Sequence, residues 1–175
     1  DLLARQFAQA SLRDSLGSFV ALHDAAHTLL RWVELISRAR GCIDLICYTF
    51  DLDVVVSALE EARRRHVAIR LLINKASAAT KSTKQLLDRL ESVEGHVKPA
   101  QRKLQIRVAE GTPLREQYTR AGTNSPIQSK KGIVHAKFLR VDSSLLVGSC
   151  NWTTSSQCNR EAVVETGLTA DGLAR

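Results

Sequence analysis

The stretch CIDLICYTFDLDVVVSALEEARRRHVAIRLLI, residues 42–73, decides the fold class. Residues 42–50 form an almost continuous apolar run, which is typical of a buried strand. Residues 53–65 carry an acid early and three arginines in the last turn, a charge order that suits a helix dipole. Residues 67–73 return to an apolar run that predicts a second strand. Strand, helix and strand in this order favour an α/β fold.

The segments on either side extend this pattern. Residues 2–14 and 19–39 predict two helices, the second because its apolar residues recur with helical spacing. Ser82 is expected to cap the next helix, and residues 104–108 predict a short strand. We therefore expect one α/β domain over residues 1–175, with a mixed, largely parallel β-sheet that has helices on both faces.

An aperiodic segment interrupts the pattern at residues 109–131. A connection of this length in a compact domain is usually functional or disordered, and we expect this one to border the functional site. Strands are predicted to follow at 133–141, 145–147 and 162–167. No internal repeat is visible, so the sequence holds a single copy of any site built on these strands.

The composition is that of an ordinary globular protein. The chain has 175 residues, 44% of them hydrophobic and 25% charged, and no apolar run approaches the roughly 18 residues of a membrane span. It begins with Asp1 and contains no Met, so we expect the natural start to lie upstream, where a signal or an anchor could be encoded. The four cysteines lack zinc-site spacing, and Cys42 and Cys47 are expected to be buried free thiols.

Positive charge is concentrated in one part of the chain. The formal net charge is +7, and residues 98–140 hold ten Lys or Arg against two acids. A concentrated basic segment attracts polyanions, so we expect a nucleic-acid partner, with anionic lipid as the alternative. Lys130 and Lys131 are the expected substrate-binding residues of this segment. A solvated surface that only aids solubility would have the same composition.

A short pattern near the C-terminal end indicates a phosphate site. His135 and Lys137 are two residues apart on a predicted strand, so their side chains point to the same face. Lysine supplies positive charge for a phosphate, and histidine supplies a nucleophile or a proton carrier. Gly148 permits a tight turn, after which Ser149 and Asn151 can offer hydrogen bonds.

This pattern resembles the signature of the phospholipase D superfamily, with His-x-Lys-x₄-Asp at residues 135–142 and Gly-Ser-x-Asn at 148–151. The stretch NWTT at 151–154 and Asn-Arg-Glu at 159–161 are similar to single-motif members, namely bacterial endonucleases and the mitochondrial cardiolipin hydrolase and Zucchini nuclease group. The resemblance covers roughly residues 20–168. It implies an α-β-α sandwich and a metal-independent phosphodiesterase, without a cofactor, whose active site is shared by the two chains of a homodimer.

The resemblance also implies a role for each site residue. His135 would attack phosphorus and form a phosphohistidine, while His135 of the partner subunit would protonate the leaving oxygen and then activate water. Lys137, Asn151 and Ser149 would hold the non-bridging oxygens. Glu161 would hydrogen-bond a histidine ring and fix its tautomer. Positioned charge and an in-line nucleophile are what phosphoryl transfer needs on physical grounds.

This sequence departs from the family pattern at two places. Five residues separate Asp142 from Gly148, where the family usually has six, so a tight turn is expected at residues 143–144. Asp142 is interpreted as a brace for that turn rather than a chemical group. The zinc-finger insertion of the Zucchini group is absent from this sequence.

Alternatives to the nuclease hypothesis use the same residues. A phospholipase D or cardiolipin hydrolase would share the site, and a non-catalytic nucleic-acid-binding module is disfavoured because the whole set of site residues is present. His23 and His27 imitate a metal pair if both lie on one helix, but without a third ligand a solvated face is the better interpretation. Trp152 could stack on a base, but a core position is the favoured interpretation.

Overall fold

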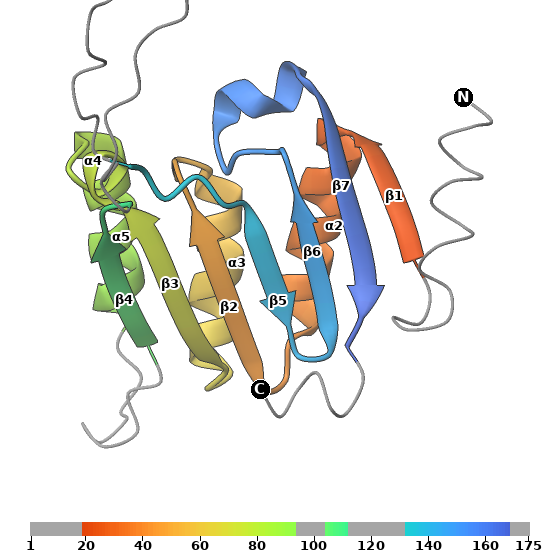
Figure 1. The fold of residues 1–175 in the computed structure, drawn as a ribbon. Helices are drawn as coiled ribbons and strands as arrows, with labels where there is room; N and C mark the ends of the chain where they lie inside the picture. Colours follow the sequence, from red (N-terminus) through yellow and green to blue (C-terminus); the bar gives the residue numbers. More distant parts are fainter. Residues whose placement is uncertain (1–18, 94–103, 112–131, 169–175) are drawn as a thin grey trace, which may run out of the picture.

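The sheet at the centre of the molecule has seven strands in the order β1-β7-β6-β5-β2-β3-β4 (Figure 1). The computed structural model describes residues 19–93, 104–111 and 132–168. The strands are β1 (Phe19–Asp24), β2 (Cys42–Cys47), β3 (Ala68–Asn74), β4 (Leu104–Ala109), β5 (Phe138–Val141), β6 (Ser144–Gly148) and β7 (Arg160–Gly167). The described helices are α2 (Ala25–Arg38), α3 (Asp53–Arg64), α4 (Lys75–Ala78), α5 (Lys81–Ser92) and the 3₁₀ helix η2 (Thr154–Cys158).

Parallel pairing is confined to one part of the sheet. β2 pairs with β3, and β3 with β4, in parallel. The pairs β2–β5, β5–β6, β6–β7 and β1–β7 are antiparallel. The predicted mixed α/β sheet is confirmed, but it is not largely parallel. The short connection from β5 to β6 permits only an antiparallel pair, whereas a parallel pair needs a crossover such as α3.

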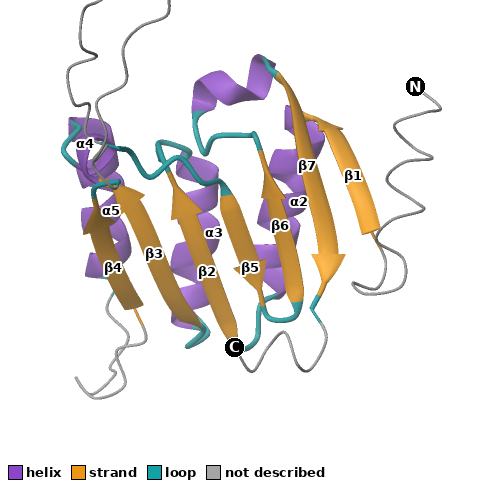
Figure 2. Cartoon of the chain, viewed as in Figure 1, coloured by secondary structure: helices purple, strands orange, loops and turns teal. Residues whose placement is uncertain are grey.

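The three long helices of the described residues lie on one face of the sheet. Figure 2 shows α2, α3 and α5 behind the strands. The core lies between these helices and the sheet, and in β2 every second residue, Ile43, Leu45 and Cys47, is fully buried. Helices were predicted on both faces of the sheet, and the long described helices cover one of them. The helix predicted at 2–14 lies outside the described residues. None of the described helices is long and apolar enough to cross a membrane.

Residues 19–24 form a strand, although the sequence predicts a helix from residue 19. β1 pairs antiparallel with β7, with Phe19 opposite Thr166 and Leu22 opposite Val163, and α2 begins only at Ala25. The prediction was wrong for this segment because β7 offers a row of backbone hydrogen-bonding groups along its edge. Pairing with that edge overrides a helical pattern that six residues cannot stabilise alone.

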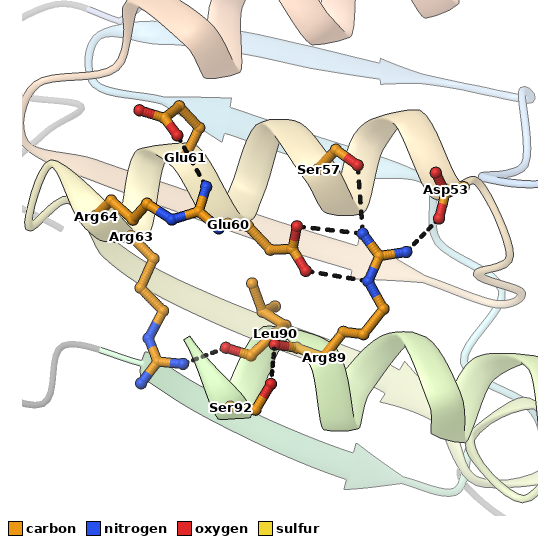
Figure 3. Close-up of polar contacts among 9 residues, drawn as sticks. All are labelled: Asp53, Ser57, Glu60, Glu61, Arg63, Arg64, Arg89, Leu90 and Ser92. Atoms are coloured by element: carbon orange, nitrogen blue, oxygen red, sulfur yellow. Dashed lines mark hydrogen bonds and ion pairs between the residues drawn. The ribbon is translucent and has the colours of Figure 1, made fainter. Parts of the chain in front are cut away.

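Arg89 joins α5 to α3 (Figure 3). Its guanidinium donates to both carboxylate oxygens of Glu60, each at 3.1 Å, and also contacts Asp53 and Ser57. In the opposite direction, Arg63 of α3 donates to two carbonyl oxygens at the C-terminal end of α5. These contacts fix the orientation of α5, whose N-terminal end lies near the site described below.

The N-cap of α5 is Thr80 and not Ser82 as predicted. The Thr80 hydroxyl accepts from the Thr83 amide at 3.4 Å, and Ser82 lies inside the first turn. Both hydroxyl residues precede the apolar part of the helix, so the sequence alone does not separate them. The Thr83 hydroxyl donates to the Phe50 carbonyl at 2.8 Å, which attaches the start of α5 to the connection between β2 and α3.

Candidate functional site

The predicted site lies at the edge of the sheet where β2 and β3 end. β5 runs antiparallel to β2, with Phe138 opposite Ile46, so the residues just before β5 lie beside those just after β2. His135 is accordingly next to Tyr48, with ring centroids 5.0 Å apart. In open α/β sheets the carboxyl ends of parallel strands are the usual place for a ligand site.

The strand predicted at 133–141 is shorter than expected, because β5 begins only at Phe138. Residues 132–137 are extended without a ladder of their own. The Val134 amide donates to the side-chain oxygen of Asn74 at 3.1 Å, and the Lys137 carbonyl accepts from the Gly148 amide at 3.2 Å. His135 therefore lies before the point where the chain joins the sheet, and its side chain is exposed.

Lys137 and His135 are in direct contact. The Lys137 Nζ lies 2.9 Å from Nδ1 and 3.0 Å from Nε2 of His135, and it donates to the His135 carbonyl at 2.8 Å. Lys137 is only 7% exposed. Burial lowers the pKa of its ammonium group below the ordinary value, and the negative charge of Glu161 opposes this shift. A buried cation beside an imidazole is suited to binding a phosphate oxygen.

The contact with both ring nitrogens has a geometric consequence. The lone-pair directions of Nδ1 and Nε2 diverge, so one ammonium cannot donate along both of them at the same time. The Lys137 Nζ therefore lies against the His135 ring and can donate to at most one of its nitrogens along the lone pair. A non-bridging phosphate oxygen is a suitable alternative acceptor for this ammonium.

Ser149 and Glu161 form a second group on the β6 and β7 side of the site. The Ser149 hydroxyl donates to Glu161 Oε2 at 2.5 Å and accepts from the Ala162 amide at 3.1 Å. Asn159 donates to Glu161 Oε1 at 3.0 Å. Ser149 therefore orients Glu161. To bind a phosphate oxygen, the Ser149 hydroxyl must first give up its hydrogen bond to Glu161. Glu161 acts on Lys137 through its charge, whereas the bond to a histidine ring is not present within the described chain and stays a prediction for a partner's ring.

Gly148 is required by close packing of β6 against β7. A Cβ at this position would lie 2.2 Å from the Ala162 carbonyl oxygen and 2.8 Å from the Val163 Cα. Any side chain would therefore separate the two strands just before Ser149. The structural role of Gly148 rests on this close packing, whereas the sequence predicted it from the freedom of the glycine backbone in a turn.

Asn151 and Trp152 follow from β6 into the loop above the sheet. The amide oxygen of Asn151 is buried and has no hydrogen-bond donor among the described residues. Trp152 is 1% exposed and stacks on Trp32 of α2, with ring centroids 3.8 Å apart and an angle of 15° between the rings. Trp152 is a core residue that fixes the site loop, as the favoured interpretation of the sequence has it.

Asp142 lies at the other end of β5, away from His135 and Lys137. Its carboxylate accepts from the backbone amides of Arg40, Gly41 and Cys42 at 2.8 to 2.9 Å. Burial opposes ionisation, but these three hydrogen bonds, helped by Arg140, hold the pKa of Asp142 below its ordinary value. Asp142 braces the start of β2 as well as the two-residue turn 142–143, where its φ is 51°.

The buried thiols in this region are unreactive. Burial raises the pKa of Cys47 and of Cys150 to about 12, and for Cys150 the charge of Glu161 adds to the effect. Cys47 is buried as predicted, but Cys42 is only partly buried.

Several predicted residues do not join the site. Lys130 and Lys131, with most of the 109–131 segment, lie outside the described residues. His23 is in β1 and His27 in α2, so they do not share a helix. Within the described ranges, no group of three or more His, Cys, Asp and Glu side chains could hold a metal ion.

Tyr48 is a site residue that the sequence analysis missed. Its ring faces His135, and the Lys137 Nζ lies 6.0 Å from the ring centroid. The available signal was its position directly after a buried parallel strand, where ligand sites are common.

Comparison with known proteins gives one family and several related structures. The sequence model of the family described as "Cardiolipin synthase, PLD-like domain" matches residues 32–169. Among curated proteins no sequence matches. NucT from Helicobacter pylori has the same fold, with a TM-score of 0.68 and 18% identity over 90% of this chain and 89% of that one.

Two further structures share the fold. Nuc from Salmonella typhimurium, described as a phospholipase D family member, has a TM-score of 0.60 and 18% identity, again over 90% of this chain and 89% of that one. The archaeal chromatin protein TrmBL2, whose structure is described as showing a novel mode of DNA binding, has a TM-score of 0.50 and 15% identity over 99% of this chain and 58% of that one.

Proposed function

The chain belongs to the phospholipase D superfamily, and we propose that it is a metal-independent phosphodiesterase that hydrolyses DNA or RNA. The observation that carries this proposal is the pair of an exposed imidazole, His135, and a buried ammonium, Lys137, in contact at the carboxyl end of β2. The basic composition of residues 98–140 supports a polyanionic substrate. The structural likeness to Nuc, which is described as a phospholipase D family member, is consistent with action on a phosphodiester.

In this mechanism a nitrogen of His135 attacks phosphorus in line with the leaving oxygen. The P–O bond breaks as the N–P bond forms, which gives a phosphohistidine. Lys137 moves from the imidazole ring to a non-bridging oxygen and stabilises the negative charge there. Water then attacks phosphorus, the N–P bond breaks, and the imidazole is regenerated.

The leaving oxygen needs a proton, and the water must lose one. The described site contains one histidine, and Glu161 is engaged with Ser149 and Asn159. We therefore assign the acid and base roles to His135 of the partner subunit in a homodimer. A two-fold axis through the site is the simplest closed arrangement that brings two such residues together.

Phospholipid is the second candidate substrate. It is favoured by the description of the matching family as a cardiolipin synthase domain. The same phosphoryl chemistry would act on an anionic headgroup, and a basic segment also binds anionic membranes. A purely binding role is disfavoured, because a nucleophile and a phosphate ligand lie in contact.

The decisive experiment tests purified protein in excess chelator on four substrates in parallel. These are labelled single-stranded DNA, single-stranded RNA, duplex DNA and cardiolipin vesicles. We expect hydrolysis of a nucleic acid that chelator does not reduce. Activity that needs added Mg²⁺ or Zn²⁺ would contradict the metal-independent mechanism. Turnover of cardiolipin alone would replace the nuclease by the phospholipid enzyme.

A further inference from the structure

A second cavity opens beside the phosphate site. Its volume is about 460 Å³. It lies between the connection that follows β2, the start of α5 and the loop that follows β6. Tyr48 and Asn151 line this cavity, and Tyr48 also contacts His135. The cavity is therefore separated from His135 only by the Tyr48 ring, and its size is within the usual range of roughly 300–1,000 Å³ for a small-ligand site.

The lining of this cavity is rich in hydroxyl groups. Eight of its twelve residues carry a hydroxyl group, and none is a lysine or an arginine. Its charged member is Asp51, whose carboxylate accepts from the Thr154 amide at 2.7 Å. A second phosphate would be repelled by this carboxylate and would find no cation. An acyl chain would desolvate the hydroxyl groups without offering them hydrogen bonds.

Part of this hydroxyl lining is already engaged and part of it faces outward. The hydroxyl groups of Thr80 and Thr83, at the start of α5, donate to the backbone carbonyl oxygens of Ser77 and Phe50, respectively. Thr153 is the N-cap of η2. Ser82 and Ser155 are exposed, so their hydroxyl groups can exchange their weak side-chain contacts for a ligand. The inner lining is rigid, whereas the rim can donate to and accept from a polar molecule.

Tyr48 adds an aromatic surface at the junction of the two sites. Its side chain is half-buried, and within the described part of the chain its hydroxyl makes no hydrogen bond. Aromatic side chains in such a position bind nucleobases by stacking, which is sequence-tolerant because every base has a π-face. A nucleoside offers a planar base for the Tyr48 ring and sugar hydroxyl groups for the polar rim, and in a nucleic acid it is joined to the phosphate.

We propose that this cavity binds the nucleoside attached to the scissile phosphate, with the base against Tyr48. This inference rests on the proposed phosphodiesterase function and specifies its substrate. A base seated in the cavity cannot remain stacked in a duplex. The enzyme therefore acts on unpaired nucleotides, and single-stranded nucleic acid is the preferred substrate over duplex and over phospholipid.

The test compares two chromogenic esters that differ only in the nucleoside: thymidine 5′-(p-nitrophenyl) phosphate and methyl p-nitrophenyl phosphate. In the wild type we expect a higher kcat/KM for the nucleoside ester. Tyr48→Ala should reduce this preference by about ten-fold, the loss that corresponds to one stacking contact. Tyr48→Phe keeps the ring and should keep the preference.

A cavity-filling pair gives a matched control on α5. Ser82→Trp places a bulky ring at the rim of the cavity and should reduce turnover of the nucleoside ester and of single-stranded DNA. Lys84→Trp places the same ring on an exposed position of the same helix that does not line the cavity, and it should have less than two-fold effect on the nucleoside ester.

The outcomes separate this inference from the proposed function. If the wild type hydrolyses neither ester, nor any nucleic acid, the phosphodiesterase proposal fails. If it hydrolyses both esters equally, or if Tyr48→Ala and Ser82→Trp leave the ratio of the two kcat/KM values unchanged, the enzyme is a phosphodiesterase and the nucleoside cavity is wrong. Duplex cleaved faster than the same strand unpaired would also overturn it.

Discussion

The two ends of β5 hold residues of one short motif, but they have different physical tasks. At one end, His135 is exposed and Lys137 is buried against its ring, in a segment that has left the sheet. At the other end, Asp142 uses its carboxylate to bind three consecutive backbone amides at the start of β2. The two ends are separated by the length of β5, and the Asp142 carboxylate is occupied by backbone amides, which supports a structural role for Asp142.

The difference shows that residues of one short sequence motif can serve two separate places in the fold. β5 pairs with β2 along its whole length, from Ile46 opposite Phe138 to Ile43 opposite Val141. Asp142 fixes the C-terminal end of β5 to the start of β2. The pairing of these two strands in turn places Lys137 beside the residues that follow β2. The reactive end thus depends on the structural end through strand register.

The largest effect is expected at the reactive end. His135→Ala should lower kcat by roughly 10²–10⁴-fold, because the nucleophile is lost, while the melting temperature changes little, because the side chain is exposed. Steady-state kinetics with thermal unfolding of the same samples checks both parts. Activity above about a hundredth of the wild-type value would place the nucleophile elsewhere.

A smaller effect of the opposite kind is expected at the structural end. Asp142→Asn replaces an anionic acceptor by an amide that cannot accept all three amide protons, and it should cost about 2 kcal/mol of the free energy of unfolding. Turnover per folded molecule should stay within two-fold of wild type. Denaturant unfolding and an assay corrected for the folded fraction measure the two quantities. A folded variant that has lost its activity would assign chemistry to Asp142.

The same variant has a predicted pH signature. The folded pKa of Asp142 is below its unfolded value, so the carboxylate contributes stability above the unfolded pKa, and this contribution is lost as the pH falls through the folded pKa. The stability difference between wild type and Asp142→Asn should therefore be full at neutral pH and should shrink in acid. A difference that is constant from neutral pH into the acid range would contradict the role of the carboxylate charge.

The smallest expected loss of activity tests whether the His135 site is shared between the two chains of a dimer. Equal amounts of wild type and His135→Ala are allowed to exchange subunits. If each site needs both histidines, only wild-type pairs are active, and about a quarter of the activity remains after random pairing of a two-fold dimer. If each chain acts alone, about half remains. A remaining activity near half, or a fully active monomer, removes the shared site.

Local pattern was sufficient for the strand–helix–strand unit at 42–73 and for most other strands of the described sheet. His135 and Lys137 are in contact, but not on the strand that was predicted to carry both, because β5 begins only at Phe138. Residues 19–24 could not be predicted in this way, because their strand depends on the edge of β7, which lies far along the chain. For the same reason, the partners of Asp142 at residues 40–42 and the cavity beside Tyr48 became visible only once distant segments were brought together.

The stacked pair Trp32 and Trp152 has a practical consequence for spectroscopy. The sequence contains only these two tryptophans, and their rings are 3.8 Å apart and nearly parallel. Tryptophan fluorescence and the tryptophan bands of the near-ultraviolet circular dichroism spectrum therefore report on a single contact, between α2 and the loop that carries Asn151. A change in this signal on adding substrate would record a movement of the site loop without any introduced label.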